Sequence, residues 1–244
     1  MFSADIIAAI KADAATRYPK ESCGIVTARG YEPQPNLSDE PEAFFVMPRC
    51  VAARAAAGEV LAVVHSHNEN GFDHPSRADQ EQCLAMGIPW GLVLVVNGKP
   101  GEPFFWGEGV ARPPIMPRDF RWGPSGTDGC GDCFALVRDW YALEMGLEIP
   151  DVARDQDWEL DDKMAYVDGY KRAGFTHVGE EQIQRGDGLL FSFGSPKRTP
   201  NHAGVYLGDG TILHHKRNCL VQRESLGFLR ASLVAVLRPP AVPA

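Results

Sequence analysis

A proline-rich stretch divides the chain and constrains its fold more than any other feature of the sequence. Residues 107–118 read GEGVARPPIMPR, with three prolines, two glycines and no apolar periodicity. Proline disfavours helix in the residue before it, so this density favours an extended connector. A length of 244 residues suits one large domain or two small ones. We therefore predict two domains, 1–107 and 119–244, joined by a linker at 108–118.

The composition is that of a globular chain with enough apolar residues for real cores. Hydrophobic residues make up 44% of the sequence, and the net charge is -8. Broad binding to a phosphate backbone needs clustered Lys and Arg, so we expect no nucleic-acid binding. No apolar run has the length of a membrane span. The first residues carry Asp5 and Lys11 and indicate an amphipathic helix, not a signal peptide, so we expect synthesis in the cytoplasm.

The cysteines do not form a pattern typical of a disulfide framework. A chain of this size without a secretory signal does not need one, and we expect most of the thiols to be buried. Only two of them lie close together in sequence. The six are Cys23, Cys50, Cys83, Cys130, Cys133 and Cys219.

The two halves of the chain predict different fold classes. Helices and strands alternate in the first half, which predicts an α/β sandwich: helix 3–15, strands 23–28 and 43–48, helix 50–58, apolar run 60–64, helix 76–86 and strand 90–96. In the second half helices come first and strands later, which predicts an α+β domain: helices 133–146 and 159–172, then strands 188–193, 202–208, 211–215 and 232–238.

Two histidines at the end of the run 60–64 are the first candidate functional group. His65 and His67 share one face if the strand continues through them, because side chains two residues apart point the same way. Asp79 follows twelve residues after His67. Two imidazoles and one carboxylate give three ligands and leave one tetrahedral position open, which is typical of a catalytic zinc site. The alternative is that Ser76 and Asp79 are only a capping box at the start of a helix.

Glu21 adds the base that a zinc-bound water needs. Together, Glu21, His65-Ser66-His67 and the Ser76–Asp79 segment resemble the JAMM (Mov34/MPN) metalloprotease motif. The resemblance implies a cytidine-deaminase-like α/β sandwich that binds Zn2+ through His65, His67 and Asp79. It also implies Glu21 as general base and Ser76 beside the tetrahedral intermediate.

Two features depart from the usual JAMM pattern. Eight residues, 68–75, separate His67 from Ser76 where the family usually has seven, and Asn68 stands where the family often has proline. A surface loop absorbs one extra residue at little cost. We expect His74, within this loop, to be solvated and do not count it as a ligand.

The Cys130–Cys133 pair lies at the start of the predicted helix 133–146 and has several interpretations. It can be half of a zinc site, although no second CxxC is present. It can be a redox pair, since a helix N-terminus favours a thiolate. Cys133 alone can be a nucleophile activated by a histidine elsewhere. The remaining alternative is a buried structural thiol.

The end of the chain resembles the NlpC/P60 cysteine peptidases, which have a papain-like fold. The segments that carry the resemblance are DCFALVRDWY, RGDGLLF and NHAGVYLGDGTILHH. The resemblance implies Cys133 as nucleophile, His202 as base and His214 as the group that orients the base. It gives Cys130 no role, and redox control by Cys130 remains a minor alternative.

Strand register separates His214 from its neighbour His215. A two-residue turn at Asp209-Gly210 places His215 on the face of His202. A three-residue loop at 208–210 with a bulge places His214 there instead, because one residue of register reverses the facing. We predict His214, with His215 as the alternative.

A JAMM-like domain followed by an NlpC/P60-like domain resembles the K-type tail assembly proteins of long-tailed bacteriophages and prophages. The resemblance implies a hydrolase at the virion tail tip, made in the host cytoplasm, that cleaves stem-peptide amide bonds of peptidoglycan at the cell wall during genome entry. It implies other tail-tip proteins as partners. The alternative is a structural or assembly factor whose hydrolase sites are vestigial or process tail proteins. A cellular isopeptidase is less consistent, because it leaves the second domain unexplained.

Overall fold

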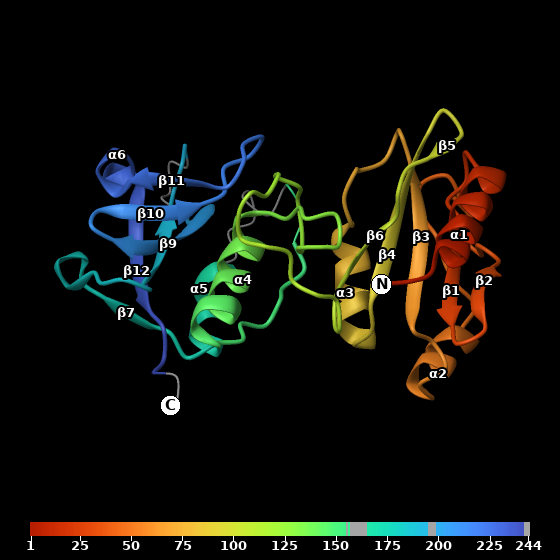
Figure 1. Ribbon diagram of the computed structural model, residues 1–244, viewed down its shortest axis with the longest axis horizontal. Helices are drawn as coiled ribbons and strands as arrows, with labels where there is room; N and C mark the ends of the chain where they lie inside the picture. The colour runs from red at the N-terminus through yellow and green to blue at the C-terminus, as the bar shows by residue number, and fades with distance from the viewer. Residues whose placement is uncertain (155, 157–164, 195–198, 242–244) are drawn as a thin grey trace. The chain divides into compact units, whose positions relative to one another are not determined.

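The computed structural model of the protein describes residues 1–154, 156, 165–194 and 199–241 (Figure 1). The chain forms two compact units. Unit 1 contains Met1–Ala111 and Gly126–Asp128, and unit 2 contains Arg112–Ser125 and Gly129–Ala244. Unit 1 is an α/β sandwich and unit 2 is α+β, so the predicted succession of fold classes is confirmed. No helix among the described residues is both long and apolar enough to cross a membrane.

Unit 1 is built on a six-stranded sheet with helices on both faces (Figure 1). Its strands, in spatial order, are β2 (Gly30–Gln34), β1 (Cys23–Thr27), β3 (Ala62–Asn68), β4 (Trp90–Val96) and β5 (Lys99–Pro100), and β6 (Phe104–Trp106) also pairs with β4. Only β3 and β4 run parallel. Parallel neighbours need a crossover connection, and α3 (Arg77–Met86) supplies it.

The two faces of this sheet carry different cores. Ala62 and Val64 point toward α1 (Ala4–Arg17) and pack with Ile10 and Ala14. Val63 points to the opposite face, where α2 (Cys50–Ala56) and α3 contribute Val51 and Cys83. Because side chains alternate along a strand, His65 and His67 face α3 as Val63 does.

The predicted strand at 43–48 is wrong. The edge strand that pairs with β1, on the side away from β3, is β2, which turns back from Thr27 at Gly30. Residues 43–48 form a loop whose backbone groups bond to the side chain of Asn36: its Nδ2 donates to the carbonyl of Phe44, and its Oδ1 accepts from the amide of Val46. A side chain therefore satisfies backbone groups that a ladder would otherwise pair.

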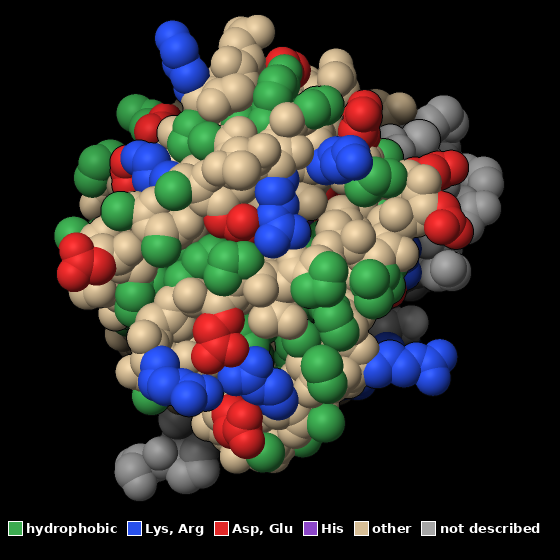
Figure 2. Space-filling view, turned by 90° about the vertical axis from the view of Figure 1, so that its right-hand side faces the viewer, with side chains coloured by type: hydrophobic (Ala, Val, Ile, Leu, Met, Phe, Trp, Pro, Cys, Tyr) green, Lys and Arg blue, Asp and Glu red, His purple; other side chains and the backbone are tan. Residues whose placement is uncertain are grey.

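Charged side chains of both signs lie on the surface of the molecule. On the face in Figure 2, basic and acidic side chains lie intermixed among apolar ones. Two ion pairs of unit 1 join charges of opposite sign. Arg54 Nη1 lies 2.8 Å from Glu32 Oε2, and Arg17 Nε lies 2.8 Å from Asp13 Oδ1. All four side chains are partly exposed to water, and ion pairs that water reaches contribute little to stability, so the buried cores hold the unit together.

Unit 2 contains an antiparallel six-stranded sheet covered on one face by α4 (Cys133–Met145). Its strands, in spatial order, are β11 (Gln222–Ser225), β10 (Thr211–His214), β9 (His202–Gly208), β8 (Gly188–Phe191), β12 (Leu233–Arg238) and β7 (Thr176–Val178). The predictions missed β7 and β11, which are short and polar. Of the predicted helix 159–172, the described part is α5 (Ala165–Arg172), and residues 159–164 lie outside the described residues.

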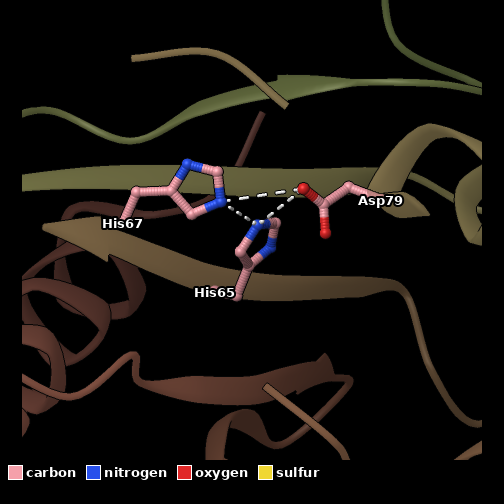
Figure 3. A group of neighbouring side chains, drawn as sticks. All are labelled: His65, His67 and Asp79. Atoms are coloured by element: carbon pink, nitrogen blue, oxygen red, sulfur yellow. Dashed lines mark hydrogen bonds and ion pairs between the residues drawn. The ribbon is translucent and has the colours of Figure 1, made fainter. Parts of the chain in front are cut away.

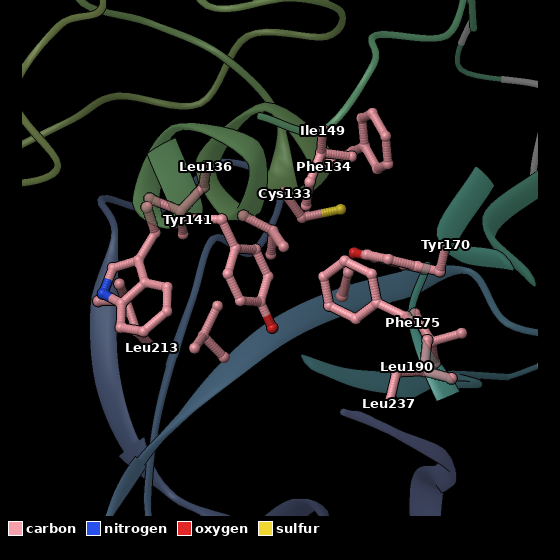
Figure 4. Packing of buried hydrophobic residues seen from close by; sticks show 14 of the residues in the cluster. Cys133, Phe134, Leu136, Tyr141, Ile149, Tyr170, Phe175, Leu190, Leu213 and Leu237 are labelled. Carbon is pink, nitrogen blue, oxygen red and sulfur yellow. The ribbon is translucent and has the colours of Figure 1, made fainter. Parts of the chain in front are cut away.

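The main core of unit 2 lies between α4 and the sheet (Figure 4). Leu136 and Tyr141 of α4 pack with Leu190 and Leu213 of the strands. The helix begins at the N-cap Asp132, whose side chain accepts a hydrogen bond from the amide of Ala135, and it ends at Gly146 with a positive φ of 64°. The sequence predicts the end of the helix at Gly146, and an aspartate is a typical N-cap. A smaller core on the other face of the sheet includes α6 (Leu226–Leu229).

The proline-rich segment is tied to unit 2 by one buried arginine. Arg118 Nη1 lies 2.8 Å from Asp139 Oδ2 on α4, and its Nη2 donates to the carbonyl of Pro113 at 2.8 Å. Both side chains of the ion pair are almost fully buried. A buried charge is tolerated only when it is paired, so this contact fixes the path of the chain into α4.

Candidate functional sites

The first candidate site is formed where β3 meets the start of α3 (Figure 3). His65 and His67 follow Val63 on the face of β3 that points to α3, and Asp79 lies in the first turn of that helix. The Nε2 atoms of His65 and His67 are 3.2 Å apart. Asp79 Oδ2 lies 3.4 Å from His65 Nε2 and 3.7 Å from His67 Nε2. The structure thus brings together the three predicted metal ligands.

The spacing of these three atoms fits a tetrahedral metal ion. Ligand atoms at zinc–nitrogen and zinc–oxygen distances of about 2.0–2.2 Å lie about 3.3–3.6 Å from one another in a tetrahedron. The three observed separations fall within a few tenths of an ångström of this range. Two imidazole nitrogens and a carboxylate, all buried, also form the donor set that zinc accepts. The residues present therefore fit a metal ion, with three protein ligands.

Ser76 belongs to the same cluster through Asp79. It is the N-cap of α3 and forms a complete capping box with Asp79. Its hydroxyl also donates to Asp79 Oδ2 at 2.6 Å, and its amide donates to the same oxygen at 2.8 Å. The capping interpretation and the ligand interpretation are therefore compatible, because the oxygen that Ser76 holds is the one that faces the histidines.

Glu21 lies two residues before the start of β1, the strand that pairs with β3, which carries the histidines. β1 pairs with β3 so that Cys23 is opposite His65, and this register brings Glu21 beside His67. Glu21 Oε1 lies 3.8 Å from His67 Nε2. Burial raises the pKa of Glu21 above its ordinary value. A carboxylate with a raised pKa next to a metal-ligand set has the placement of a general base.

The surroundings of the histidines orient their rings. His67 Nδ1 lies 2.8 Å from the carbonyl oxygen of Phe72, so Nδ1 carries the proton and Nε2 is left as the ligand atom. The ring of His65 is stacked on Phe45, with centroids 4.5 Å apart, and lies edge-on to Trp90. The loop 43–48, which the sequence predicts as a strand, therefore covers His65 with the ring of Phe45. Such contacts outside the ligand set fix the ligands in place.

His74 is not solvated as predicted. It is 3% exposed, its Nδ1 lies 2.9 Å from Asp73 Oδ1, and its ring contacts that of Phe72. The loop folds back on its own aromatic side chain, which shields the imidazole from water. The cluster of metal-ligand atoms found among the described residues contains His65, His67 and Asp79 and does not extend to His74.

The second candidate site involves α4, β9 and β10. Cys133 is the first residue of α4 and is 4% exposed, in the core cluster that also contains Ala203, the neighbour of His202. His202 Nε2 lies 3.1 Å from His214 Nδ1, so the structure brings these two predicted residues together.

A bulge decides which histidine faces His202. The turn has two residues, Asp209 and Gly210, both with positive φ. Gly208 pairs with Thr211, but Ile212 pairs with Tyr206, so the register shifts by one residue. The two-residue turn alone would bring His215 to His202, and the bulge reverses that facing. His214 faces His202, whereas His215 points to the other side, 5.2 Å from the ring of Phe120.

Gly204 makes the close approach of the two histidines possible. It lies opposite His214 in the β9–β10 ladder. A Cβ atom at position 204 would come within 3.1 Å of the Cβ of His214 and 2.9 Å of the carbonyl oxygen of Leu213. Glycine two residues after His202 therefore leaves room for His214 to reach the ring of His202, which gives a physical reason for glycine at this position.

The three buried histidines near this site, His202, His214 and His215, are neutral at pH 7. Burial lowers the pKa of His202 to about 3 and the pKa values of His214 and His215 to about 4. A neutral imidazole can accept a proton, whereas an imidazolium cannot. His202 therefore has the protonation state that a general base requires.

Arg154 is a contributor that sequence reasoning missed. Its guanidinium pairs with both oxygens of Asp132, at 2.5 Å and 3.0 Å, and with Asp151 at 2.7 Å. It also lies over the ring of Phe134, 4.9 Å from its centroid. Asp132 precedes Cys133 and caps α4, so Arg154 fixes the turn that presents the thiol. No pattern in the sequence links residues 132 and 154.

The six cysteines form no disulfide.

Comparisons with known proteins match both units. The model of the family "Prokaryotic homologs of the JAB domain" matches residues 3–108, and the NlpC/P60 family model matches residues 117–236. The JAMM-like and NlpC/P60-like fold classes predicted from the sequence are therefore confirmed, and the NlpC/P60 match identifies a peptidase-type hydrolase domain.

Two phage proteins are similar to most of the chain. Tail tip assembly protein K of Escherichia phage N15 is 33% identical over 237 residues, which cover 91% of this chain and 88% of that protein. Tail tip assembly protein K of Escherichia phage lambda is 35% identical over 172 residues, which cover 68% of this chain and 75% of that protein. Among solved structures, an NLP/P60 family protein from Staphylococcus aureus has a TM-score of 0.37 and 18% identity, covering 51% of this chain and 37% of that one.

The geometry of the first site predicts one metal ion per chain. Purified protein should contain about one equivalent of zinc, and His67→Ala should lose it, because two ligands bind far more weakly than three. Elemental analysis measures both. His177→Ala, at an exposed histidine of unit 2, is the matched control and should retain the metal. Full zinc content in His67→Ala would show that the metal interpretation is wrong.

The lowered pKa values predict that unit 2 loses stability in mild acid. Below pH about 6.5 the unfolded chain binds protons on His202, His214 and His215, whereas the folded chain does not until pH about 4. The stabilisation is therefore present above pH about 6.5 and is lost as the pH falls toward 4, by about 1.4 kcal/mol per histidine per pH unit at most.

Urea unfolding at pH 7, 6 and 5 measures this dependence. His215→Gln removes one of the three buried imidazoles and should make the decline shallower, whatever its effect on stability at pH 7. Equal slopes in the parent and in His215→Gln would contradict the prediction.

Proposed function

The chain belongs to the tail tip assembly protein K family, and from this membership we propose that it is a phage or prophage tail-tip hydrolase that cleaves peptidoglycan. The proposed activity resides in a cysteine endopeptidase site in unit 2, with a zinc metallopeptidase site in unit 1. The substrate of the cysteine site is the amide between the γ-D-glutamyl residue and the diamino acid of the stem peptide. Cleavage there would open the wall locally during genome entry.

The hydrogen bond between His202 and His214 carries the proposal for unit 2. Because Nε2 of His202 bonds to His214, Nδ1 is the nitrogen left for the thiol. His202 Nδ1 accepts the proton of Cys133 while Sγ bonds to the carbonyl carbon. The proton then passes to the leaving amine as the C–N bond breaks, and water hydrolyses the resulting thioester. The N-terminal end of α4 stabilises negative charge at the thiol.

The donor set of unit 1 supports a second hydrolytic site. His65, His67 and Asp79 would hold zinc, which supplies Lewis-acid activation of water for amide hydrolysis. Glu21 accepts the proton that the attacking water gives up and delivers it to the leaving amine. Ser76 holds Asp79 through two hydrogen bonds, and the resemblance to the JAMM motif would place it beside the tetrahedral intermediate.

We place the protein at the tail tip of the virion, in contact with other tail-tip proteins. It would be made in the host cytoplasm and act at the cell wall or in the periplasm after the particle has carried it there. The family membership supports this location.

Replacement of the nucleophile tests the cysteine site. Cys133→Ala should abolish cleavage of purified peptidoglycan, because no other group in the site can form the thioester. Cleavage by the parent should survive a metal chelator. Fragments identified by mass spectrometry measure both the rate and the bond cut. Cys130→Ala is the matched control and should keep its activity, and equal rates in Cys133→Ala and the parent would refute the assignment.

Replacement of the base tests the metal site separately. In a Cys133→Ala background, zinc-dependent hydrolysis of a peptide library should be lost in Glu21→Gln, which cannot accept a proton, while the zinc content stays unchanged. Glu40→Gln, an exposed acid of the same unit, should hydrolyse as well as its background. Hydrolysis by Glu21→Gln at the background rate would exclude Glu21 as the base.

A further inference from the structure

The hydrogen-bonded chain of the second site continues beyond the two predicted histidines. His214 uses Nδ1 toward His202, and its Nε2 lies 3.1 Å from Glu224 Oε2. Glu224 is on β11, which pairs with β10 so that Ile212 is opposite Glu224 and His214 is opposite Gln222. The side chains of His202, His214 and Glu224 therefore lie in a row across three neighbouring strands.

Glu224 is a carboxylate and remains ionised. Lys216 Nζ lies 2.8 Å from the same oxygen that faces His214, and this hydrogen bond lowers the pKa of Glu224 below its ordinary value. Burial, and after it the charge of Lys216, lower the pKa of His214 to about 4. At neutral pH the pair is therefore a neutral imidazole beside a carboxylate, not an imidazolium–carboxylate pair.

A neutral imidazole carries one proton, so only two arrangements of the row exist. In the first, His214 donates from Nε2 to Glu224 and accepts at Nδ1 from His202 Nε2. In the second, His214 donates from Nδ1 to His202, and its Nε2 lone pair then faces the carboxylate. An ionised carboxylate can only accept hydrogen bonds, so the second arrangement sets two acceptors against each other at 3.1 Å. The charge of Glu224 therefore selects the first arrangement.

The first arrangement is the one that a base at His202 requires. If His202 is protonated at Nε2, its Nδ1 holds a lone pair and can accept a proton from a thiol. If it is protonated at Nδ1, it cannot. In serine peptidases an acid fixes the base in one tautomer directly, and an incorrect tautomer lowers the rate by orders of magnitude.

We propose that Glu224 is a positioning residue of the cysteine site, which fixes the tautomer of His214 and, through it, the tautomer of His202. The inference rests on the proposed cysteine peptidase function. It adds a fourth member to the nucleophile, base and orienting group, and it assigns a role to the lysine at 216 as the partner that keeps Glu224 charged.

Gln222 is a further polar side chain close to His214, with its Nε2 3.5 Å from His214 Nε2. An amide offers both a donor and an acceptor, so it is compatible with either tautomer of His214. Gln222 therefore cannot make the selection, whereas a carboxylate can. For the same reason an amide in place of Glu224 should permit both arrangements.

The variant Glu224→Gln keeps the size of the side chain and removes its charge. Nitrogen-15 NMR of histidine-labelled protein reports which ring nitrogen carries the proton. The spectra are recorded at pH about 7.5, which is about one unit above the ordinary histidine pKa. Signals of the two rings are assigned from their loss in His202→Gln and His214→Gln. In the parent, both rings should be protonated at Nε2. In Glu224→Gln, a population protonated at Nδ1 should appear on both.

The same variant should digest purified peptidoglycan about 100-fold more slowly, with the loss in kcat and not in KM. Glu144→Gln, an exposed acid on α4, is the charge-matched control and should match the parent in both measurements. Parent-like tautomers in Glu224→Gln would overturn the inference, and so would a parent-like rate despite altered tautomers. If Cys133→Ala still digests peptidoglycan, the proposed function fails, and the NMR result then tests the tautomer assignment alone.

Discussion

The alternation of side chains along a β-strand is the constraint on which both candidate sites depend. Each central strand is covered on both faces, so every residue is assigned to one side or the other. On β3 this sends Val64 to the core under α1 and Val63, His65 and His67 to the side of α3. The metal-ligand cluster then needs only a helix whose first turn delivers a carboxylate, and the Ser76–Asp79 capping box provides that turn.

The same alternation in unit 2 depends on a single irregularity. The turn at Asp209-Gly210 alone would have turned His214 away from His202. The bulge in β9 restores the facing, and Gly204 leaves the space that His214 fills. A row of polar side chains then crosses β9, β10 and β11 on one face, while α4 packs on a core that includes Ala203 and Val205 of the same strand. The site is therefore a property of the register and not of any single residue.

The sequence predicts those parts of the structure that local chemistry determines. The capping box of α3, the glycine that ends α4, the period of β3 and the spacing of Glu21, His65, His67 and Asp79 are all local patterns or strong motifs. The predictions that are wrong or missing involve contacts between parts of the chain that are distant in sequence or depend on the folded environment. The apolar residues 43–48 have strand composition, but the side chain of Asn36 takes up their backbone groups and Phe45 covers His65. His74 lies in a polar loop that nevertheless buries it. Arg154 and Glu224 meet their partners from elements distant in sequence, which no spacing rule links to Asp132 or His214.

The central claim is that Cys133 is a nucleophile despite its burial, and the relative reactivity of the six thiols tests it most directly. The native protein is treated with limiting iodoacetamide, and the modified positions are identified by peptide mapping. Cys50 and Cys219 are exposed and serve as internal standards. The account predicts that Cys133, at the N-terminus of α4 in a site with a neutral imidazole base, is alkylated before either of them. Alkylation of Cys50 and Cys219 with Cys133 left intact would contradict the account and identify Cys133 as a structural thiol.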